Sequence, residues 1–233
     1  MTAVALTTAG RVPAERLRTS VLAPEVTAAL SELSGSELTV SVDLAVRRGP
    51  GSPVRLRARH GVRGEQVTAV STTLSGVVEV ARLDLDDWQA ELARAVTVSP
   101  SGAGPAPPAP DLLLPWDLLI GTGAARARCR SEVYDVLVAR AVGSCRADGR
   151  TLDLAGCHDQ LRRLYAATGR MRAVGVGPGG SRPRVGWVSW LLVADGWRAL
   201  TPTVRDHRPM VHVEPRRPTD LALDVAGWLA AVR

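Results

Sequence analysis

The alternation of hydrophobic and polar residues changes its period early in the chain. Residues 22–33 place hydrophobic side chains three or four positions apart, which predicts a short helix. From residue 38 the period is two, and it returns in residues 54–59, 66–73 and 76–83, with turn residues between these segments. The pattern predicts a four-strand antiparallel meander with one apolar and one polar face.

A second helix is predicted directly after the meander. The segment Asp84-Leu-Asp-Asp-Trp provides a capping residue and acidic side chains in the first turn, as is typical of a helix N-terminus. This helix start accounts for Asp86 and Asp87 better than an acid–base pair does. The apolar stripe of the helix consists of Leu85, Trp88, Leu92 and Val96.

The second part of the chain predicts another set of helices and strands. Ser131 begins a helix, residues 152–168 form the next one, and a final helix starts at Pro218 or Thr219. Between the last two helices the period of two returns. It predicts strands over residues 170–177, 184–195, 197–204 and 210–215.

Six prolines between residues 99 and 115 predict a linker that divides the chain. We therefore expect a flexible arm over 1–20, an N-terminal half over 21–98, the linker over 99–115 and a C-terminal half over 116–233. Each half runs from helix through strands to helix, so the halves are pseudo-symmetric in their elements. The expected fold class is α+β, with antiparallel sheet meanders and flanking helices.

The composition of the chain bears on whether its partner is a nucleic acid. The chain has 233 residues and a formal net charge of +6, which raises nucleic acid as a partner. Lysine and asparagine are absent and arginine supplies the basic side chains, which is typical of a high-GC genome and weakens that inference. A basic nucleic-acid-binding protein is therefore the alternative function, and no nucleic acid is expected as the main partner.

The cysteines and the apolar runs favour a cytoplasmic protein. Three cysteines are an odd number for a disulfide framework, and the N-terminal residues lack an apolar core of secretory length. The longest apolar runs, such as residues 185–194, are too short to span a membrane. We expect a reduced chain without a membrane segment, and the oligomeric state is left open.

The motif-like features of the chain point away from catalysis. Gly175-Val-Gly-Pro-Gly-Gly180 matches the dinucleotide fingerprint, but a strand-like run follows where a phosphate site needs a helix, so we expect a hairpin loop. Cys145, Cys157 and the histidines lack the spacing of metal ligands. No hydrolase, P-loop or zincin motif is present. We therefore predict no enzyme activity, no cofactor and no metal.

Arg55, Arg57 and Arg59 are the most specific candidates for a binding surface. At a period of two they project from one face of their strand, and Ser41 and Asp43 on the neighbouring strand extend this polar face. The face is either simply solvated, or a docking surface for a protein of complementary polarity, or a phosphate-binding surface.

The tryptophans of the C-terminal strands supply a further candidate. Trp187 and Trp190 differ by three positions, so on one strand they point to opposite faces. Either both are packed in the core, or one is exposed as an interface anchor. We take Trp190 as the candidate partner-binding residue.

Two series of short motifs carry a family resemblance. The first is Glu37-Leu-Thr-Val-Ser-Val, Pro53-Val-Arg-Leu-Arg-Ala, Gln66-Val-Thr-Ala-Val, Val77-Val-Glu-Val-Ala-Arg and Asp87-Trp-Gln-Ala-Glu-Leu. The second is Gln160-Leu-Arg-Arg-Leu-Tyr, Gly169-Arg-Met-Arg-Ala-Val, Val185-Gly-Trp-Val, Asp195-Gly-Trp and Leu200-Thr-Pro. Their order resembles the EspG family, secretion-associated proteins of type VII (ESX) systems in high-GC Gram-positive bacteria.

The resemblance covers residues 36–98 and 155–232. It implies a pseudo-twofold α+β fold and a cytoplasmic chaperone that holds a helical secretion substrate, such as a PE–PPE-like or WxG-like dimer, before export. It also implies that binding needs no nucleotide or metal. Partner-contact residues are not transferred, because no contact motif of the family matches this sequence.

Overall fold

The computed structural model describes residues 12–13, 24–47, 49, 51–72, 77–97, 110–179 and 181–232. The chain divides into two compact units. The first, unit 1, consists of Met1–Val98, Met171–Val188 and Pro218–Arg233, and the second, unit 2, of Ser99–Arg170 and Ser189–Arg217. Neither unit is a continuous segment, because the chain passes from one to the other several times.

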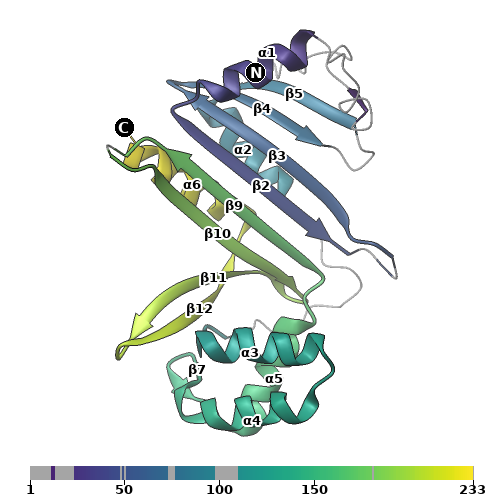
Figure 1. Ribbon diagram of the computed structural model, residues 1–233, viewed down its shortest axis with the longest axis vertical. Coiled ribbons are helices and arrows are strands. Elements are labelled where there is room, and N and C mark those ends of the chain that lie inside the picture. Colours follow the sequence, from purple (N-terminus) through teal and green to yellow (C-terminus); the bar gives the residue numbers. More distant parts are fainter. Residues whose placement is uncertain are drawn as a thin grey trace. The chain divides into compact units, whose positions relative to one another are not determined.

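Unit 1 is built on an antiparallel sheet with the strand order β1-β5-β4-β3-β2-β9-β10 (Figure 1). Strands β2 to β5 form a continuous meander, as the alternating pattern predicts. The long connection from β5 to β9 places β9 beside β2. The strands are β1 (Val12–Pro13), β2 (Leu38–Val46), β3 (Val54–Arg63), β4 (Gln66–Thr72), β5 (Val77–Asp84), β9 (Gly169–Gly177) and β10 (Arg184–Val193).

Two helices of unit 1, α2 (Leu85–Ala95) and α6 (Pro218–Val232), pack side by side on one face of this sheet. Helix α2 begins at its predicted cap, where the Asp84 carboxylate accepts a hydrogen bond of 2.8 Å from the backbone N–H of Asp87. Its Trp88 is buried against His60 of β3, with ring centroids 6.0 Å apart. The apolar face of the meander is therefore the face that α2 and α6 cover.

The remaining helix of unit 1, α1 (Pro24–Ser34), lies on the opposite face of the sheet, over β3, β4 and β5. Val26 and Ala29 pack against Val80 in a small buried cluster. At the end of the helix, Glu32 accepts hydrogen bonds from Thr68 at 2.7 Å and from Arg82 at 2.6 Å. These two bonds hold the pKa of Glu32 below its usual range, the bond from Arg82 having the larger effect.

Unit 2 extends from the second half of β10 in the order β10-β11-β12-β6-β7-β8. Leu112, Leu114, Val211 and Val213 alternate with outward-facing neighbours and form the sheet side of its core. The helices cover that side through Leu118, Val138, Leu161 and Leu164. The elements are β6 (Leu112–Pro115), α3 (Trp116–Ala127), α4 (Ser131–Ala141), the 3-10 turn Val142–Ser144, β7 (Arg146–Ala147), β8 (Arg150–Thr151), α5 (Leu154–Tyr165), β11 (Gly196–Arg205) and β12 (Arg208–Arg216).

The α+β class and the antiparallel sheet confirm the prediction from the sequence. Strands β9 and β10 are neighbours in the sheet, as the expected hairpin requires, and β9 includes Gly175 and Gly177. Among the described residues, no helix is long and apolar enough to cross a membrane.

Three features of the fold differ from the expectation. Helix α3 was not predicted, and residues 112–115 of the expected linker form β6, because Leu112 and Leu114 are buried in the core. The compact units also interleave, whereas the sequence predicted halves over 21–98 and 116–233. The reason is that β9 and the first part of β10 complete the sheet of unit 1, and α6, at the end of the described chain, packs against α2. Most of the predicted arm 1–20 and of the linker 99–115 lies outside the described residues.

Candidate functional site

The five polar residues expected on one sheet face do share it. In the register of β2 and β3, Ser41 lies opposite Arg59 and Asp43 opposite Arg57, while Arg55 continues the row. Because His60 of the same strand points toward α2, the row with the opposite alternation points away from α2 and α6. All three arginines are exposed to solvent.

One ion pair forms within this row. The Arg57 guanidinium lies 3.5 Å from the Asp43 carboxylate, and both side chains are about half exposed or more. Such an exposed ion pair stabilises the fold by at most about 1 kcal/mol, so the two side chains can separate when a partner binds. Among the described residues, neither Arg55 nor Arg59 forms an ion pair, and both guanidinium groups are available to a partner.

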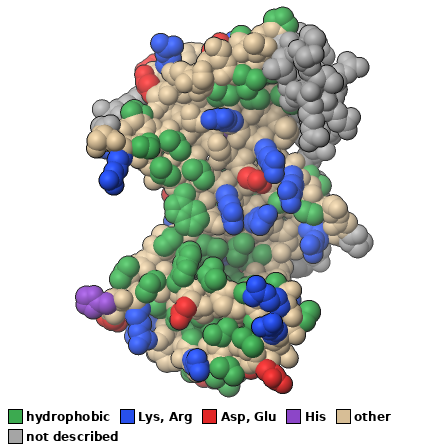
Figure 2. Space-filling model, viewed as in Figure 1, with side chains coloured by type: hydrophobic (Ala, Val, Ile, Leu, Met, Phe, Trp, Pro, Cys, Tyr) green, Lys and Arg blue, Asp and Glu red, His purple; other side chains and the backbone are tan. Residues whose placement is uncertain are grey.

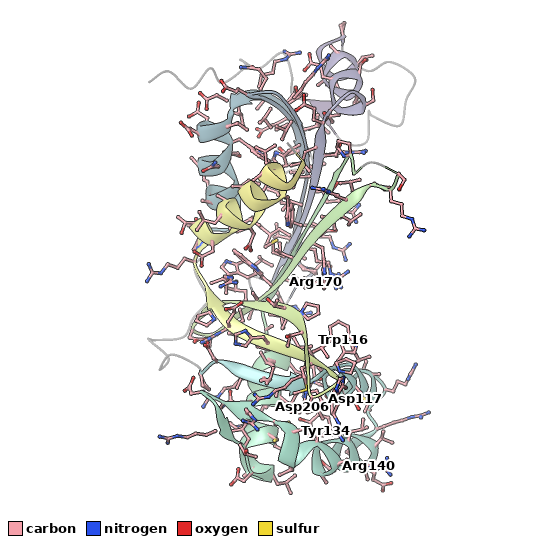
Figure 3. All side chains as sticks on the ribbon, turned by 90° about the vertical axis from the view of Figure 1, so that its left-hand side faces the viewer. Trp116, Asp117, Tyr134, Arg140, Arg170 and Asp206 are labelled. Atoms are coloured by element: carbon pink, nitrogen blue, oxygen red, sulfur yellow. The ribbon has the colours of Figure 1, made fainter. Side chains whose placement is uncertain are left out.

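Helix α1 covers another part of this face, over β4, β5 and one end of β3. A side chain at Gly61 would collide with Ser36 and Leu33 of the α1 region, so the helix end lies directly on β3 at that position. In the row of Ser41 and Arg59, α1 packs on Val80 of β5, while Ser41 and Arg59 on β2 and β3 are exposed. Figure 3, in which the molecule is turned by 90° from the view of Figure 1, shows α2 and α6 on one side of the strands and α1 on the other.

Trp190 is not part of the exposed surface, which corrects the prediction. Its side chain is 0% exposed, and its ring packs against Trp197 with centroids 6.1 Å apart. Trp187 is the exposed member of the pair, with 46% of its surface accessible. The spacing of three residues correctly implied opposite faces, but only the packing of Trp190 against Trp197 decides which face is buried.

Four exposed hydrophobic side chains gather on β9 and β10 of unit 1. They are Val174, Val176, Val185 and Trp187, with exposed fractions of 37%, 42%, 63% and 46%. We call them the apolar strip. Their neighbours Gly175 and Gly186 face the other way and lie against Trp228 of α6. The strip therefore points away from α6, because successive strand residues alternate between faces.

The apolar strip and the arginine row lie on the same face of unit 1. Both point away from the paired helices α2 and α6, and β2 is the strand that separates β3 from β9. Arg172 of β9 is also exposed on this face, since it alternates with the buried Met171 and Ala173. Figure 2 shows hydrophobic side chains gathered beside a group of basic ones on this side. We call the whole surface the open face.

The open face carries an unbalanced charge. Among the described residues of this face, the arginines at positions 55, 57, 59 and 172 lie beside the acid Asp43. Exposed apolar side chains beside unpaired guanidinium groups form a surface that is complementary to a partner with apolar and acidic groups.

The apolar strip was not among the residues expected from the sequence. A signal for the strip was present in residues 169–177. One face of this segment consists of small or apolar residues, and the other face ends in the apolar residues Val174 and Val176. Such a strand has two apolar faces at one end, and both cannot be covered by a single helix layer.

Unit 2 contains a separate pocket of about 600 Å³. Thr201, His212, Leu113 and Arg146 form one row across its floor, on the face of the sheet opposite the helices. The Thr201 hydroxyl donates a hydrogen bond of 3.5 Å to Glu214, and not to His212. The row therefore lacks the contact between hydroxyl and base that an activated nucleophile needs.

Cys145 and Cys157 are structural, whereas Cys129 is exposed. Cys145 and Cys157 are both buried in the core of unit 2, and burial raises the pKa of both thiols. They are therefore protonated core side chains at neutral pH. Within the described part of the chain, no group of three or more His, Cys, Asp or Glu residues is arranged to hold a metal ion.

Comparison with known proteins gives a match in structure but not in sequence. No protein-family model matches the chain, and no curated protein is significantly similar to it. A solved structure of the Mycobacterium tuberculosis type VII secretion system chaperone EspG5, in complex with a PE25–PPE41 dimer, is similar with a TM-score of 0.56. The match covers 89% of this chain and 78% of that chain at 15% sequence identity.

The chain has an EspG-like fold. This agrees with the resemblance in the sequence motifs, which was based on β2 to β5, α2 and the C-terminal strands. Two other structures, a GphF dehydratase variant and a peroxisomal multifunctional enzyme from Drosophila melanogaster, have TM-scores of 0.10 and 0.11 and carry no argument.

Proposed function

We propose that this EspG-like chain is a holding chaperone or adaptor that binds a helical protein on the open face. The observation that carries the proposal is the exposed apolar strip, Val174, Val176, Val185 and Trp187, bordered by arginines on the sheet face opposite α2 and α6. Clustered exposed hydrophobic side chains with a polar border are typical of protein-binding surfaces.

The physical basis is the removal of apolar surface from water. Each valine or tryptophan of the strip, if fully covered by a partner, contributes roughly 1.5–3 kcal/mol before the costs of association are subtracted. Trp187 is suited to be the anchor, since tryptophan is enriched among the residues that dominate binding energies. The same burial protects an apolar surface on the partner from aggregation, which is what a holding chaperone does.

The partner that we propose is a helical type VII secretion substrate. EspG5 is described as a secretion chaperone in complex with a PE25–PPE41 dimer, and an EspG-like fold with an open apolar face supports a partner of that class. The substrate would be a PE–PPE-like or WxG-like dimer held in the cytoplasm before export. No nucleotide or metal enters this mechanism, because binding and release are set by the two surfaces.

Co-purification tests this proposal. The full chain, tagged and expressed with the PE–PPE-like or WxG-like pairs encoded near it, should elute with one pair as a complex of defined mass in size-exclusion chromatography with light scattering. The variant Val185→Asp should lose the complex, since it places a charge in the apolar strip. The matched control is Val204→Asp, at an exposed strand valine of unit 2, and it should keep the complex.

Two results would contradict the proposed function. One is the absence of any complex with all such pairs, together with a pull-down that enriches no helical export substrate. The other is a tight affinity of the chain for duplex DNA or RNA with a steep salt dependence, which would favour the alternative of a nucleic-acid-binding protein.

A further inference from the structure

We propose that the open face takes one amphipathic helix that lies along β9, with an apolar stripe against the apolar strip and a row of acidic residues along one side of that stripe only, facing β2 and β3. This inference rests on the proposed function and specifies the chemistry of the partner. It is carried by the positions of the strip and of the arginines on neighbouring strands.

The spacing of strands and helices sets where the acidic row falls. Neighbouring strands lie about 4.8 Å apart, so β3 is about 10 Å from β9 across β2. A helix with its side chains is about 10–12 Å in diameter. A helix seated over β9 therefore places one flank over β2, within reach of the long side chains of Arg55, Arg57 and Arg59 that project from β3.

The spacing along the strands also matches a helix. Alternate residues of a strand, such as Arg55 and Arg57, are about 6.7 Å apart. Helix residues four positions apart are separated by about 6 Å along the axis. Acidic residues at every fourth position on one flank would therefore meet successive arginines, while the residues of the apolar stripe meet Val174 and Val176. Strand β9 has 9 residues and extends about 30 Å, as does a helix of about 20 residues.

The charges of the open face favour an acidic flank and disfavour a second copy of this chain. Asp43 is the one acid of the row, and it is paired with Arg57 at 3.5 Å, which leaves Arg55 and Arg59 as unpaired cations among the described residues. In a symmetric dimer formed through this face, the same arginines of both copies would approach one another, and like charges would oppose the contact.

A single exposed tryptophan also fits a helix better than a nucleic-acid strand. Binding of single-stranded nucleic acid uses several aromatic side chains on which successive bases stack. On the open face Trp187 is the aromatic residue, and its neighbours in the strip are the aliphatic Val174, Val176 and Val185. Aliphatic side chains pack well against leucine and valine on a helix.

Three synthetic helical peptides test the inference. Each has about 20 residues, the length matched to β9 above, and the same leucine stripe, and they carry glutamate, glutamine or arginine along one side of it. Fluorescence anisotropy with the full-length chain at low salt should show the glutamate peptide binding at least tenfold more tightly than the arginine peptide, with the glutamine peptide between them. The difference should shrink at high salt.

Charge reversal on the protein should invert this preference. The variant Arg55→Glu/Arg57→Glu/Arg59→Glu should bind the arginine peptide more tightly than the glutamate peptide. Its control is Arg150→Glu/Arg205→Glu/Arg208→Glu, which changes the net charge equally at exposed arginines of unit 2 and should keep the wild-type order. Circular dichroism and thermal unfolding of both variants establish that they are folded.

The possible outcomes separate this inference from the proposed function. Equal affinity for the three peptides, or an unchanged order in the Arg55/Arg57/Arg59 variant, overturns the one-sided acidic helix even if an export substrate is captured. Competition by duplex DNA that displaces the glutamate peptide at equal concentration also overturns it. A clear preference for the glutamate peptide without any captured export substrate supports the helix inference and contradicts the secretion role.

Discussion

His60 is a histidine whose acid–base chemistry is strongly changed by the fold. It lies on β3 beneath α2, is nearly fully buried, and contacts the ring of Trp88. Among the described residues, its Nδ1 atom has no hydrogen-bond partner. Burial disfavours the charged imidazolium and lowers the pKa of His60 from 6.5 to about 4, against the smaller opposing effect of the Glu91 carboxylate.

The depressed pKa predicts a loss of stability in mild acid. Because the folded state favours the neutral ring, the free energy of unfolding has its full value above pH 6.5. It decreases as the pH falls toward 4. The expected loss in the free energy of unfolding is about 3 kcal/mol at pH 4. It is measured by urea unfolding of the wild type and of His60→Leu across this range.

Comparing the wild type with His60→Leu separates the effect of His60 on stability from the effect of the carboxylates that also titrate in this pH range. The wild-type curve should fall more steeply with acid than the variant curve, and the gap should open between pH 6.5 and 4. Parallel curves would show that His60 titrates at an ordinary pKa and is not held neutral by α2.

At the scale of elements, the contact between α6 and the β9–β10 hairpin positions the apolar strip. Trp228 of α6 lies directly on Gly175 and Gly186, and a Cβ atom built on Gly175 would be 2.5 Å from its Cε3 atom. Glycine on one face of each strand admits the indole ring, and the larger residues on the other face are left exposed. The close approach of a backbone to a side chain explains glycine at both positions.

We expect Gly186→Ala to destabilise the protein by about 1–3 kcal/mol, because the added methyl group collides with the Trp228 ring. The free energy of unfolding from urea titration is the measurement. In Gly186→Ala/Trp228→Ala, the collision is absent, so the glycine substitution should cost much less in that background.

Gly227→Ala is the matched control for this effect. It lies beside Trp228 in the same helix, and an added Cβ atom there has no neighbour within 4 Å. It should be neutral or slightly stabilising, since alanine favours a helix over glycine. An equal loss from Gly186→Ala in both Trp228 backgrounds would contradict the proposed packing.

At the scale of the whole molecule, the order of elements in the sequence differs from their grouping in space. Unit 1 takes residues from the beginning, the middle and the end of the chain. Its α2 packs against α6, and its β2 pairs with β9. The N-terminal meander and α2 thus bury their apolar faces only when the C-terminal elements are present.

This arrangement predicts that residues 21–98 do not fold as an independent domain. The isolated fragment lacks β9, β10 and α6, so it should show no cooperative thermal transition by circular dichroism, whereas the full chain should show one. Mixing the fragment with residues 99–233 should restore part of the signal. A cooperative transition in the fragment alone would support the division into halves that the linker suggested.

Much of the local structure was predictable from residue patterns. The period of two located β2 to β5, the acidic first turn located α2, and Pro218 marked the start of α6. The face shared by Arg55, Arg57 and Arg59 followed from the same alternation. Helix α3 and the strand β6 were missed, since a short apolar run next to prolines has no clear period.

The sequence by itself determined most of the strands and helices and the two sides of the predicted strands, because hydrophobic periodicity is a local property of the chain. Only the tertiary structure decided that β9 lies beside β2, that Trp190 is buried while Trp187 is exposed, and that the arginine row and the apolar strip share one face. These features depend on backbone pairing and helix packing between residues far apart in sequence, which no local pattern specifies.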